Sequence, residues 1–475
     1  MQARPDAPER AHGLLPPPER LAPWMALWLA CCLVLAYGFD IGRGFIADDY
    51  GWIAHHRDLW SLDALGRVFV ETPMGFYRPA VSLSFFLNHV MFGTAPIGYA
   101  LTNLALVLGI AGALHGLTRA LGGSRMAGVF GAGLWMFNVH GIGMALTWIS
   151  GRTSLLATLF AVLAAVASVR RRMWLAAACT LAALLSKEEP ILLPVVLGAW
   201  VAIDRHAAGD APGAALVRAA RATWPSFLAL GVYLGLRAQS TAMTPASAPS
   251  YYALSVSPSV LLPNALSYAD RAGTFAAAVL LIGVVVFARQ RPQWMPQERR
   301  LALKGVVWLV LGFALTVMVP ARSDLYTCLP SVGVSLIAVA MGQAVWRQVP
   351  AARRLPAFAA AALLPLALLP VYRARNAPNR DNARFAEQIV EHVGRALAAR
   401  DDLSRVELFQ SVGERPSLKA AIGGALPLAV NWRTGRHITS AIHEVPRETQ
   451  VTAPPAGTLH VRIDQGTIVS VAGPQ

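Results

Sequence analysis

Residues 21–39, LAPWMALWLACCLVLAYGF, form an apolar run without a charged side chain. About 20 such residues are needed for a helix to cross the hydrocarbon core of a bilayer. Ten further apolar runs follow, near residues 97–118, 126–140, 154–169, 173–186, 190–203, 223–237, 272–288, 305–320, 326–346 and 356–372. The repetition predicts an all-α polytopic membrane protein with about 11 transmembrane helices.

The composition supports the same class of protein. Of the 475 residues, 55% are hydrophobic and only 14% are charged, whereas soluble domains average about 25% charged residues. Lys and Arg number 41 against 26 Asp and Glu, an excess that in a soluble chain would suggest a nucleic-acid partner. Here the basic residues lie in short joints between apolar runs, so we exclude nucleic acid and expect them to set the topology.

The joints rich in Arg predict which ends of the helices face the cytoplasm. Basic residues concentrate in alternate joints, at Arg119 and Arg125, Arg170 to Arg172, Arg205 to Arg221, Arg289 to Lys304, and Arg347 to Arg354. By the positive-inside rule these joints are cytoplasmic. We therefore expect a multi-pass protein of the bacterial inner (plasma) membrane. Residues 1–20 would form a cytoplasmic tail, 21–372 a membrane domain with a long polar first outer loop at about 40–95, and 373–475 a periplasmic domain.

The last hundred residues differ in character from the rest. A polar helical stretch is predicted at about 379–400. Short alternating segments follow, among them Arg405–Phe409 and Thr458–Ile463, which are typical of strands separated by Pro and Gly turns. We expect a small α+β domain.

Cysteine and histidine give no sign of a metal centre or of a disulfide framework. The four cysteines lie in or beside apolar runs, and the histidines are scattered without the spacing of metal ligands. These residues are Cys31, Cys32, Cys179 and Cys328, and His55, His56, His89, His115 and His140.

Five polar motifs fall in the predicted outer joints. Adjacent acids at Asp48 and Asp49 repel each other unless a metal, a cation or a proton offsets them, but such a pair also suits a helix start. Arg78 before a proline suits a phosphate, or a side chain that reaches the bilayer edge from a buried stem. Gly151-Arg152 permits close approach of a ligand, or is an ordinary turn.

The remaining two motifs also admit two interpretations. Lys187, Glu188 and Glu189 place three charges in a very short joint, either at the aqueous edge or paired in a cavity. Arg322 and Asp324 put a cation and an acid in another outer joint. Because all five motifs map to one face of the membrane, they favour a site for a phosphate-bearing lipid and a hydroxyl acceptor.

The motifs also occur in a recognisable order: Asp48-Asp49-Tyr50, Tyr77-Arg78-Pro79, Gly98-Tyr-x-Leu-x-Asn103, Trp148-Ile-Ser-Gly-Arg152, Ser186-Lys187-Glu188 and Leu325-Tyr-x-x-Leu-Pro-Ser-Val-Gly333. Over about residues 22–385, this ordered set resembles the membrane half of the GT-C glycosyltransferases, in the branch of the protein O-mannosyltransferases and the TMTC-type enzymes. The resemblance implies a GT-C-like fold. It also implies inverting transfer of a hexosyl unit from a polyprenyl-phosphate donor to an envelope acceptor (protein, lipid or glycan) on the periplasmic side.

The resemblance implies a role for each motif residue. An acid of the first outer loop would be the catalytic base, which falls on Asp48 or Asp49. The donor phosphate would be held by basic residues of the outer loops, and the substrate oriented by three others. The phosphate-binding residues are Arg78, Arg152, Lys187 and Arg322, and the orienting residues are Glu188, Asp324 and Tyr77. Some enzymes of this kind use a divalent cation and others do not, so a cation cofactor stays open and no metal ligand is predicted.

Two other functions compete with this one. A transporter or flippase of a lipid-linked saccharide would carry charges in mid-span and an inverted repeat, and neither is found in the sequence. A non-catalytic assembly partner would keep the fold without the chemistry. Met144 and Thr153 stand near positions where related sequences carry acids, which favours the assembly partner, whereas the Asp48–Asp49 pair favours the enzyme.

Overall fold

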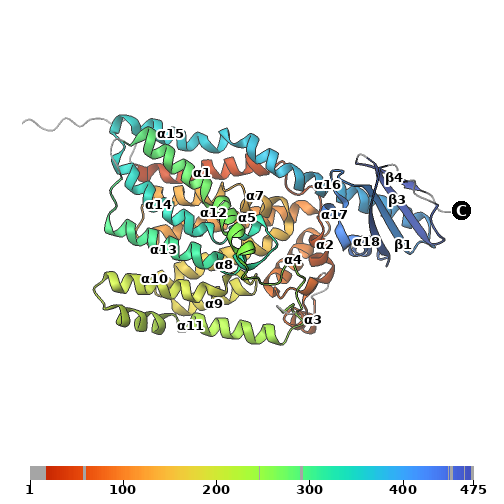
Figure 1. Cartoon of the computed structure of the whole chain (residues 1–475), viewed down its shortest axis with the longest axis horizontal. Coiled ribbons are helices and arrows are strands. Elements are labelled where there is room, and N and C mark those ends of the chain that lie inside the picture. Colours follow the sequence, from red (N-terminus) through yellow and green to blue (C-terminus); the bar gives the residue numbers. More distant parts are fainter. Residues whose placement is uncertain are drawn as a thin grey trace, which may run out of the picture.

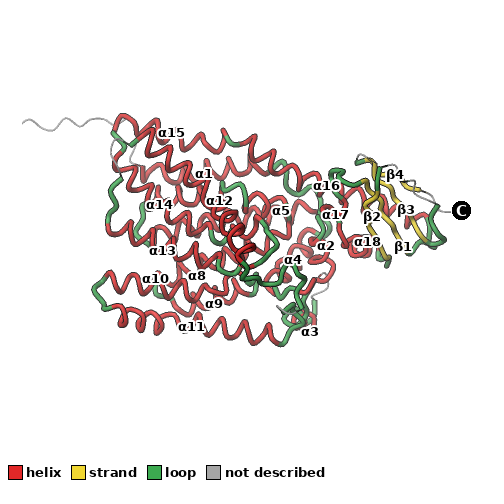
Figure 2. The backbone as a smooth tube through the Cα atoms, viewed as in Figure 1, coloured by secondary structure: helices red, strands yellow, loops and turns green. Residues whose placement is uncertain are grey.

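The computed structural model of the chain describes residues 18–56, 60–244, 247–288, 292–447, 449, 453–464 and 466–471. Most of the predicted tail, residues 1–20, and Arg289 and Arg291 of one Arg-rich joint lie outside the described residues. Helices make up most of the structure, and a small sheet follows them near the C-terminus (Figures 1 and 2).

The helices of the body run side by side along the long axis (Figure 1). Their bounds are α1 Pro18–Tyr37, α2 Asp48–His56, α3 Leu62–Arg67, α4 Pro79–Phe92, α5 Pro96–Ala120, α6 Arg125–Met136, α7 Gly141–Thr147, α8 Arg152–Val169, α9 Met173–Leu184, α10 Leu193–Ala207, α11 Pro212–Ala238, α12 Pro258–Ile282, α13 Pro296–Phe313, α14 Ser331–Gln348, α15 Ala351–Ala367 and α16 Leu369–Ala399.

Seven helical stretches of the described chain are long and apolar enough to cross a membrane: Glu19–Tyr37, Pro96–Ala120, Ile149–Val169, Glu189–Ala207, Pro258–Phe287, Pro296–Met318 and Ala351–Ala399. An eighth is formed if α6 and α7, which meet at 66°, are taken as one broken span. Each predicted apolar run is helical in whole or in large part, but α9 has only 12 residues. The multi-pass architecture is therefore found, and the figure of about 11 spans stays a prediction.

The Arg-rich joints meet at one end of the bundle. The backbone N–H of Arg125 donates to the Glu19 carboxylate over 3.1 Å, and the Gln297 side chain donates to the Gly122 carbonyl over 3.0 Å. The Arg347 guanidinium also forms an ion pair with the Glu298 carboxylate, which connects the joint at the start of α13 with the joint at the end of α14. The C-terminal sheet lies at the opposite end (Figure 1), which agrees with the topology that the basic residues predict.

The segment predicted as a polar outer loop, 40–95, is largely helical. It contains α2, α3 and α4, and α4 is an apolar helix of 14 residues whose Val81 and Phe85 are fully buried. Its start is fixed by Pro79, which is favoured at the first position of a helix. The sequence did not predict α4 as a helix, because its 14 residues are fewer than the roughly 20 that a membrane span needs. The outer position of segment 40–95 stays a prediction.

The C-terminal domain is built on a four-stranded sheet with the order β2-β1-β3-β4. The strands are β1 Arg405–Ser411, β2 Thr439–Val445, β3 Thr458–Asp464 and β4 Thr467–Val471, and the short helices are α17 Leu418–Ala421 and α18 Leu426–Thr434. Strand β1 pairs in parallel with β2 and β3, and β3 pairs antiparallel with β4. The two predicted strands and the α+β class are confirmed.

This domain is continuous with the membrane body. Helix α16 runs without interruption across the expected boundary at residue 372, and Tyr372 near its start is buried among the membrane helices. At the other side of the domain, the Trp432 ring lies 5.4 Å from the Phe45 ring and 6.3 Å from the Tyr50 ring. The backbone N–H of Ala47 donates to the Ala421 carbonyl over 3.0 Å. The domain therefore packs directly on the start of α2.

Candidate functional site

The two acids at the start of α2 have separate environments. Asp49 is completely buried, and its carboxylate accepts hydrogen bonds from the backbone N–H of Ile46 at 2.8 Å and of Ser150 at 2.6 Å. The Ser150 hydroxyl donates to it as well. Asp48 precedes it by one residue and is exposed. Successive residues of a helix point about 100° apart, so one turn presents one carboxylate outward and ties the other inward.

Burial controls the acidity of Asp49. Desolvation raises the pKa of Asp49 to about 7, although its hydrogen bonds with Ser150 and Ile46 oppose the rise. The partners are neutral donors, and this carboxylate joins α2 to the 3-10 turn Ile149–Gly151. Asp49 is therefore tied to this turn by its hydrogen bonds, and its catalytic role stays a prediction.

Arg152 lies deeper in the same layer. Its side chain is 0% exposed and donates from Nε to the Asn103 side-chain oxygen at 2.9 Å and from an Nη to the Tyr99 carbonyl at 2.8 Å. The other Nη approaches Ser84 at 3.3 Å, and the guanidinium lies over the Phe85 ring at 4.6 Å. The side chain is enclosed by protein groups, so it is not presented to a ligand in this structure.

Asn103 connects Arg152 to the turn after α7. Its side-chain amide donates to the carbonyls of Ala145 and Ile149 at 2.9 and 3.0 Å. We call the four buried residues Asp49, Asn103, Ser150 and Arg152 the inner layer. Three of the sequence motifs, Asp-Asp-Tyr, Gly-Tyr-x-Leu-x-Asn and Trp-Ile-Ser-Gly-Arg, meet in it.

A second group of charged residues lines the outer side of α2. Arg78 forms a two-point pair with Glu188, at 2.8 Å from Nη2 to Oε1 and 3.3 Å from Nε to Oε2. Burial alone would raise the pKa of Glu188, but the charge and hydrogen bonds of Arg78 lower it to about 2. Desolvation raises the pKa of Asp48, and the charge of Arg78 opposes that rise. We call Asp48, Arg78 and Glu188 the outer rim.

The cation beside the rim is already paired. Lys187 is 4% exposed, forms an ion pair with the equally buried Glu189, and donates to the Ser154 hydroxyl at 2.8 Å. Its ammonium lies 4.9 Å from the centre of the Tyr326 ring. The predicted phosphate-binding Lys187 is therefore held within the protein, beside the partly exposed Tyr326.

Further cations gather around Asp324. Arg271 of α12 pairs with its carboxylate at 2.9 Å, and His140 approaches it at 3.5 Å. Burial raises the pKa of Asp324, but the hydrogen bond from His140 and the charge of Arg271 outweigh it, so the pKa lies below its usual range. Arg375 of α16 lies 3.2 Å from Nδ1 of His140, the same nitrogen that approaches Asp324. The exposed Arg322 donates to the Asn264 side chain at 2.7 Å.

Aromatic side chains stand among these charges. The Arg78 guanidinium lies 4.2 Å from the centre of the Phe76 ring, which meets the Tyr252 ring at 5.8 Å. Tyr77, predicted to orient the substrate, is instead fully buried against Tyr233, with 6.0 Å between ring centres. Mixed acids, cations and aromatic rings at a bundle end suit a ligand that has hydroxyl groups and a phosphate.

Several residues of this region had no signal in the sequence. Arg271, Asn264, Tyr252 and Arg375 come from separate helices or loops whose contact depends on the packing of distant segments. His140 lies in the break between α6 and α7, and a bent helix beside a polar cluster is the feature that would have identified it. Within the described ranges, no group of three or more His, Cys, Asp or Glu is arranged to hold a metal ion, so a divalent cation rests on the resemblance alone.

Neither a protein-family profile nor a curated protein matches this chain. The functional interpretation therefore depends on the ordered motifs and on the geometry of the inner layer and the outer rim.

Proposed function

We propose that this protein is a GT-C-like membrane glycosyltransferase. It would move a hexosyl unit from a polyprenyl-phosphate donor to a hydroxyl of an envelope acceptor. The observation that carries the proposal is Asp48, an exposed carboxylate on the outer rim within the field of Arg78. We assign the rim to the periplasmic side of a bacterial inner membrane because the Arg-rich joints lie at the other end of the bundle.

In the proposed step, Asp48 accepts the proton of the acceptor hydroxyl while the hydroxyl oxygen attacks the anomeric carbon of the donor sugar. The bond from that carbon to the phosphate oxygen breaks, and the polyprenyl phosphate leaves with the bonding electrons. Attack from the face opposite the phosphate inverts the configuration. Cations near the leaving phosphate would stabilise its growing charge.

The cations best suited to the donor phosphate are the accessible ones. Arg322 and Arg375 are exposed, and Arg271 is 24% exposed. Arg152 and Lys187 are enclosed or paired, so we assign them a positioning role in place of the phosphate contact that the motif order suggests. Arg78 would act near the base, where Glu188 fixes its orientation.

A second candidate is a non-catalytic assembly partner with the same fold. The burial of Arg152 and Lys187 favours it, because two of the four cations expected at the donor serve internal contacts. The exposed position of Asp48 favours the enzyme.

The deciding experiment compares lipid-linked sugars and envelope glycans in cells that lack the gene and in cells that carry Asp48→Asn. A glycan that disappears in both, while its lipid-linked donor persists, would support the transferase. The matched control is Asp63→Asn, which changes an exposed acid in the first turn of α3. If Asp48→Asn restores the glycan that the deletion removes, the carboxylate is not the base and the assembly partner is favoured.

A further inference from the structure

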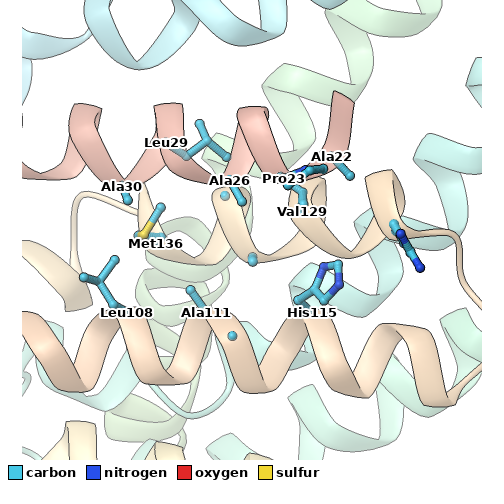
Figure 3. Close-up of a pocket in the computed structure, with 14 residues that line it drawn as sticks. Ala22, Pro23, Ala26, Leu29, Ala30, Leu108, Ala111, His115, Val129 and Met136 are labelled. Atoms are coloured by element: carbon cyan, nitrogen blue, oxygen red, sulfur yellow. The ribbon is translucent and has the colours of Figure 1, made fainter. Parts of the chain in front are cut away.

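A cavity opens between α1, α5 and α6 (Figure 3), and Arg125 of an Arg-rich joint is one of the residues that line it. Its volume is about 510 Å³, within the range of roughly 300–1,000 Å³ that ligand sites occupy. Helix α6 packs against both α1 and α5 and forms the floor. The volume exists because small residues line the cavity, including Ala26 and Ala30 of α1 and Gly133 of α6.

The cavity faces the surroundings of the bundle. Ala26 is exposed, and the neighbouring Leu27 of α1 and Leu108 of α5 are 57% and 38% exposed. Both helices are long and apolar enough to span a membrane. Apolar side chains that project from such helices contact lipid, so the cavity opens to the hydrocarbon layer.

One end of the cavity is apolar and the other is basic. Leu108 and Met136 lie toward one end of the cavity and His115 toward the other (Figure 3). Arg125, the first residue of α6, also lines the cavity. The His115 ring lies close to α6 because Gly128 has no side chain; a Cβ there would lie 2.7 Å from Nδ1. Among the described residues, this nitrogen has no hydrogen-bond partner.

Arg125 leaves its guanidinium available. Glu19 bonds the backbone N–H of Arg125, and no carboxylate in the described part of the chain forms an ion pair with the side chain. Arg119, one turn beyond His115 on α5, adds a second cation and donates to the Gly123 carbonyl at 2.8 Å. Of the acids in the part of the chain that the structure describes, Glu19 contacts the backbone of Arg125, and the two cations outnumber it, so this part of the cavity mouth has a net positive charge.

From this arrangement we propose that the cavity binds one acyl chain of an anionic glycerophospholipid, whose phosphate lies against Arg125 and His115. The chain occupies the small-residue groove in the leaflet opposite the outer rim. A transmembrane helix of a partner would place no phosphate beside Arg125, and a free anion would leave the apolar part of the cavity unfilled. The charge and the hydrocarbon lining together therefore select a lipid. This site is separate from the proposed transfer reaction.

The test uses the full-length protein in detergent, with phosphatidylglycerol and phosphatidylcholine as probes and native mass spectrometry as the readout. Wild-type protein is expected to retain phosphatidylglycerol in preference to phosphatidylcholine. Ala26→Trp fills the groove and is expected to abolish this retention, whereas Ala278→Trp, at an exposed alanine of α12, is expected to preserve it. Arg125→Gln should weaken phosphatidylglycerol binding by about fivefold and leave phosphatidylcholine binding unchanged.

Equal retention of the two lipids by the wild type would overturn the proposal, as would normal retention by Ala26→Trp. If Ala26→Trp fails to fold, Ala111→Leu narrows the groove from α5 with a smaller side chain and carries the same expectation. The wild type could instead be a dimer and Ala26→Trp a monomer with the same bound lipid. That result would identify the groove as a contact between copies of the chain and would also contradict the lipid site.

Discussion

The inner layer and the outer rim hold charged side chains with different kinds of partner. In the inner layer, Asp49 and Arg152 are completely buried and rely on neutral partners, namely backbone groups, Ser150 and Asn103. On the outer rim, Arg78 faces Glu188 directly as an ion pair, and Asp48 stays exposed. Buried charges with neutral partners fix geometry at a cost in desolvation, whereas accessible charges can exchange protons or ligands. Under the proposed function, the inner layer would hold the site in position and the outer rim would carry the chemistry.

The largest expected effect tests the rim. Asp48→Asn should lower transfer by 100-fold to 10,000-fold, the range that general-base catalysis contributes. The unfolding temperature should stay unchanged because the side chain is exposed. Transfer assays on purified protein, paired with thermal unfolding, measure both quantities. Full activity in this variant would show that Asp48 of the outer rim is not the catalytic base, so the outer rim would no longer differ from the inner layer in function.

The next effect tests the inner layer. Arg152→Met should lower the free energy of unfolding by about 3 kcal/mol, because the Asn103 oxygen and the Tyr99 carbonyl would lose their buried donor. Denaturant titration in detergent and the amount of protein in the membrane report this loss. Arg322→Met is the matched control and should have little effect on stability, since Arg322 is exposed. Equal stability of both variants would show that burial of Arg152 is not what holds the layer.

A smaller effect is expected at the cation of the rim. Arg78→Lys retains the charge but loses the two-point pair with Glu188 and the planar contact with Phe76. Arg78 is buried and Glu188 is 34% exposed; since the lysine keeps the charge, the loss of stability should be about 1 kcal/mol. Transfer should fall by about tenfold through misorientation beside Asp48. A fall in kcat with no further loss of stability would agree with a positioning role, and normal kinetics would exclude one.

The smallest effect is a pH dependence that belongs to the inner layer. The pKa of Asp49 is about 7 in the folded protein and near 3.8 when unfolded, so the folded state binds the proton more tightly. Stability from this group is complete below pH 4 and is lost as pH rises through 7; the last part of the loss, between pH 6 and 8, is about 1.4 kcal/mol. Thermal unfolding at several pH values should show this decline in the wild type and not in Asp49→Asn. An identical slope in both would assign the decline to other groups.

The sequence predicted the helical body well because long apolar runs have few alternatives to a membrane helix. It also placed β1 and β3, whose alternating side chains suit a sheet with one buried face. It missed α4, which is apolar but short, and it divided the chain at residue 372, where α16 continues because its apolar start and its polar remainder belong to one helix.

For the site, the motifs identified the right segments but not the direction of each side chain. Asp48 and Asp49 are adjacent and chemically equal in the sequence, but in the structure Asp49 turns inward and Asp48 is exposed, after a residue, Ala47, with a positive φ of 38°. Arg152 and Arg322 were also equivalent as predictions, yet one is enclosed and the other is exposed. Burial depends on segments far away in the chain, so it could not be deduced from the local motif.

The contact between Trp432 and the start of α2 has a consequence for the order of synthesis. The turn that bears Asp48 is synthesised before most of the membrane helices, whereas Ala421 and Trp432, which support it, are synthesised after them. Until the domain with the sheet has folded and docked, this turn lacks that support. A chain that stops before Ala421 would therefore leave the Asp48 turn without its final contacts.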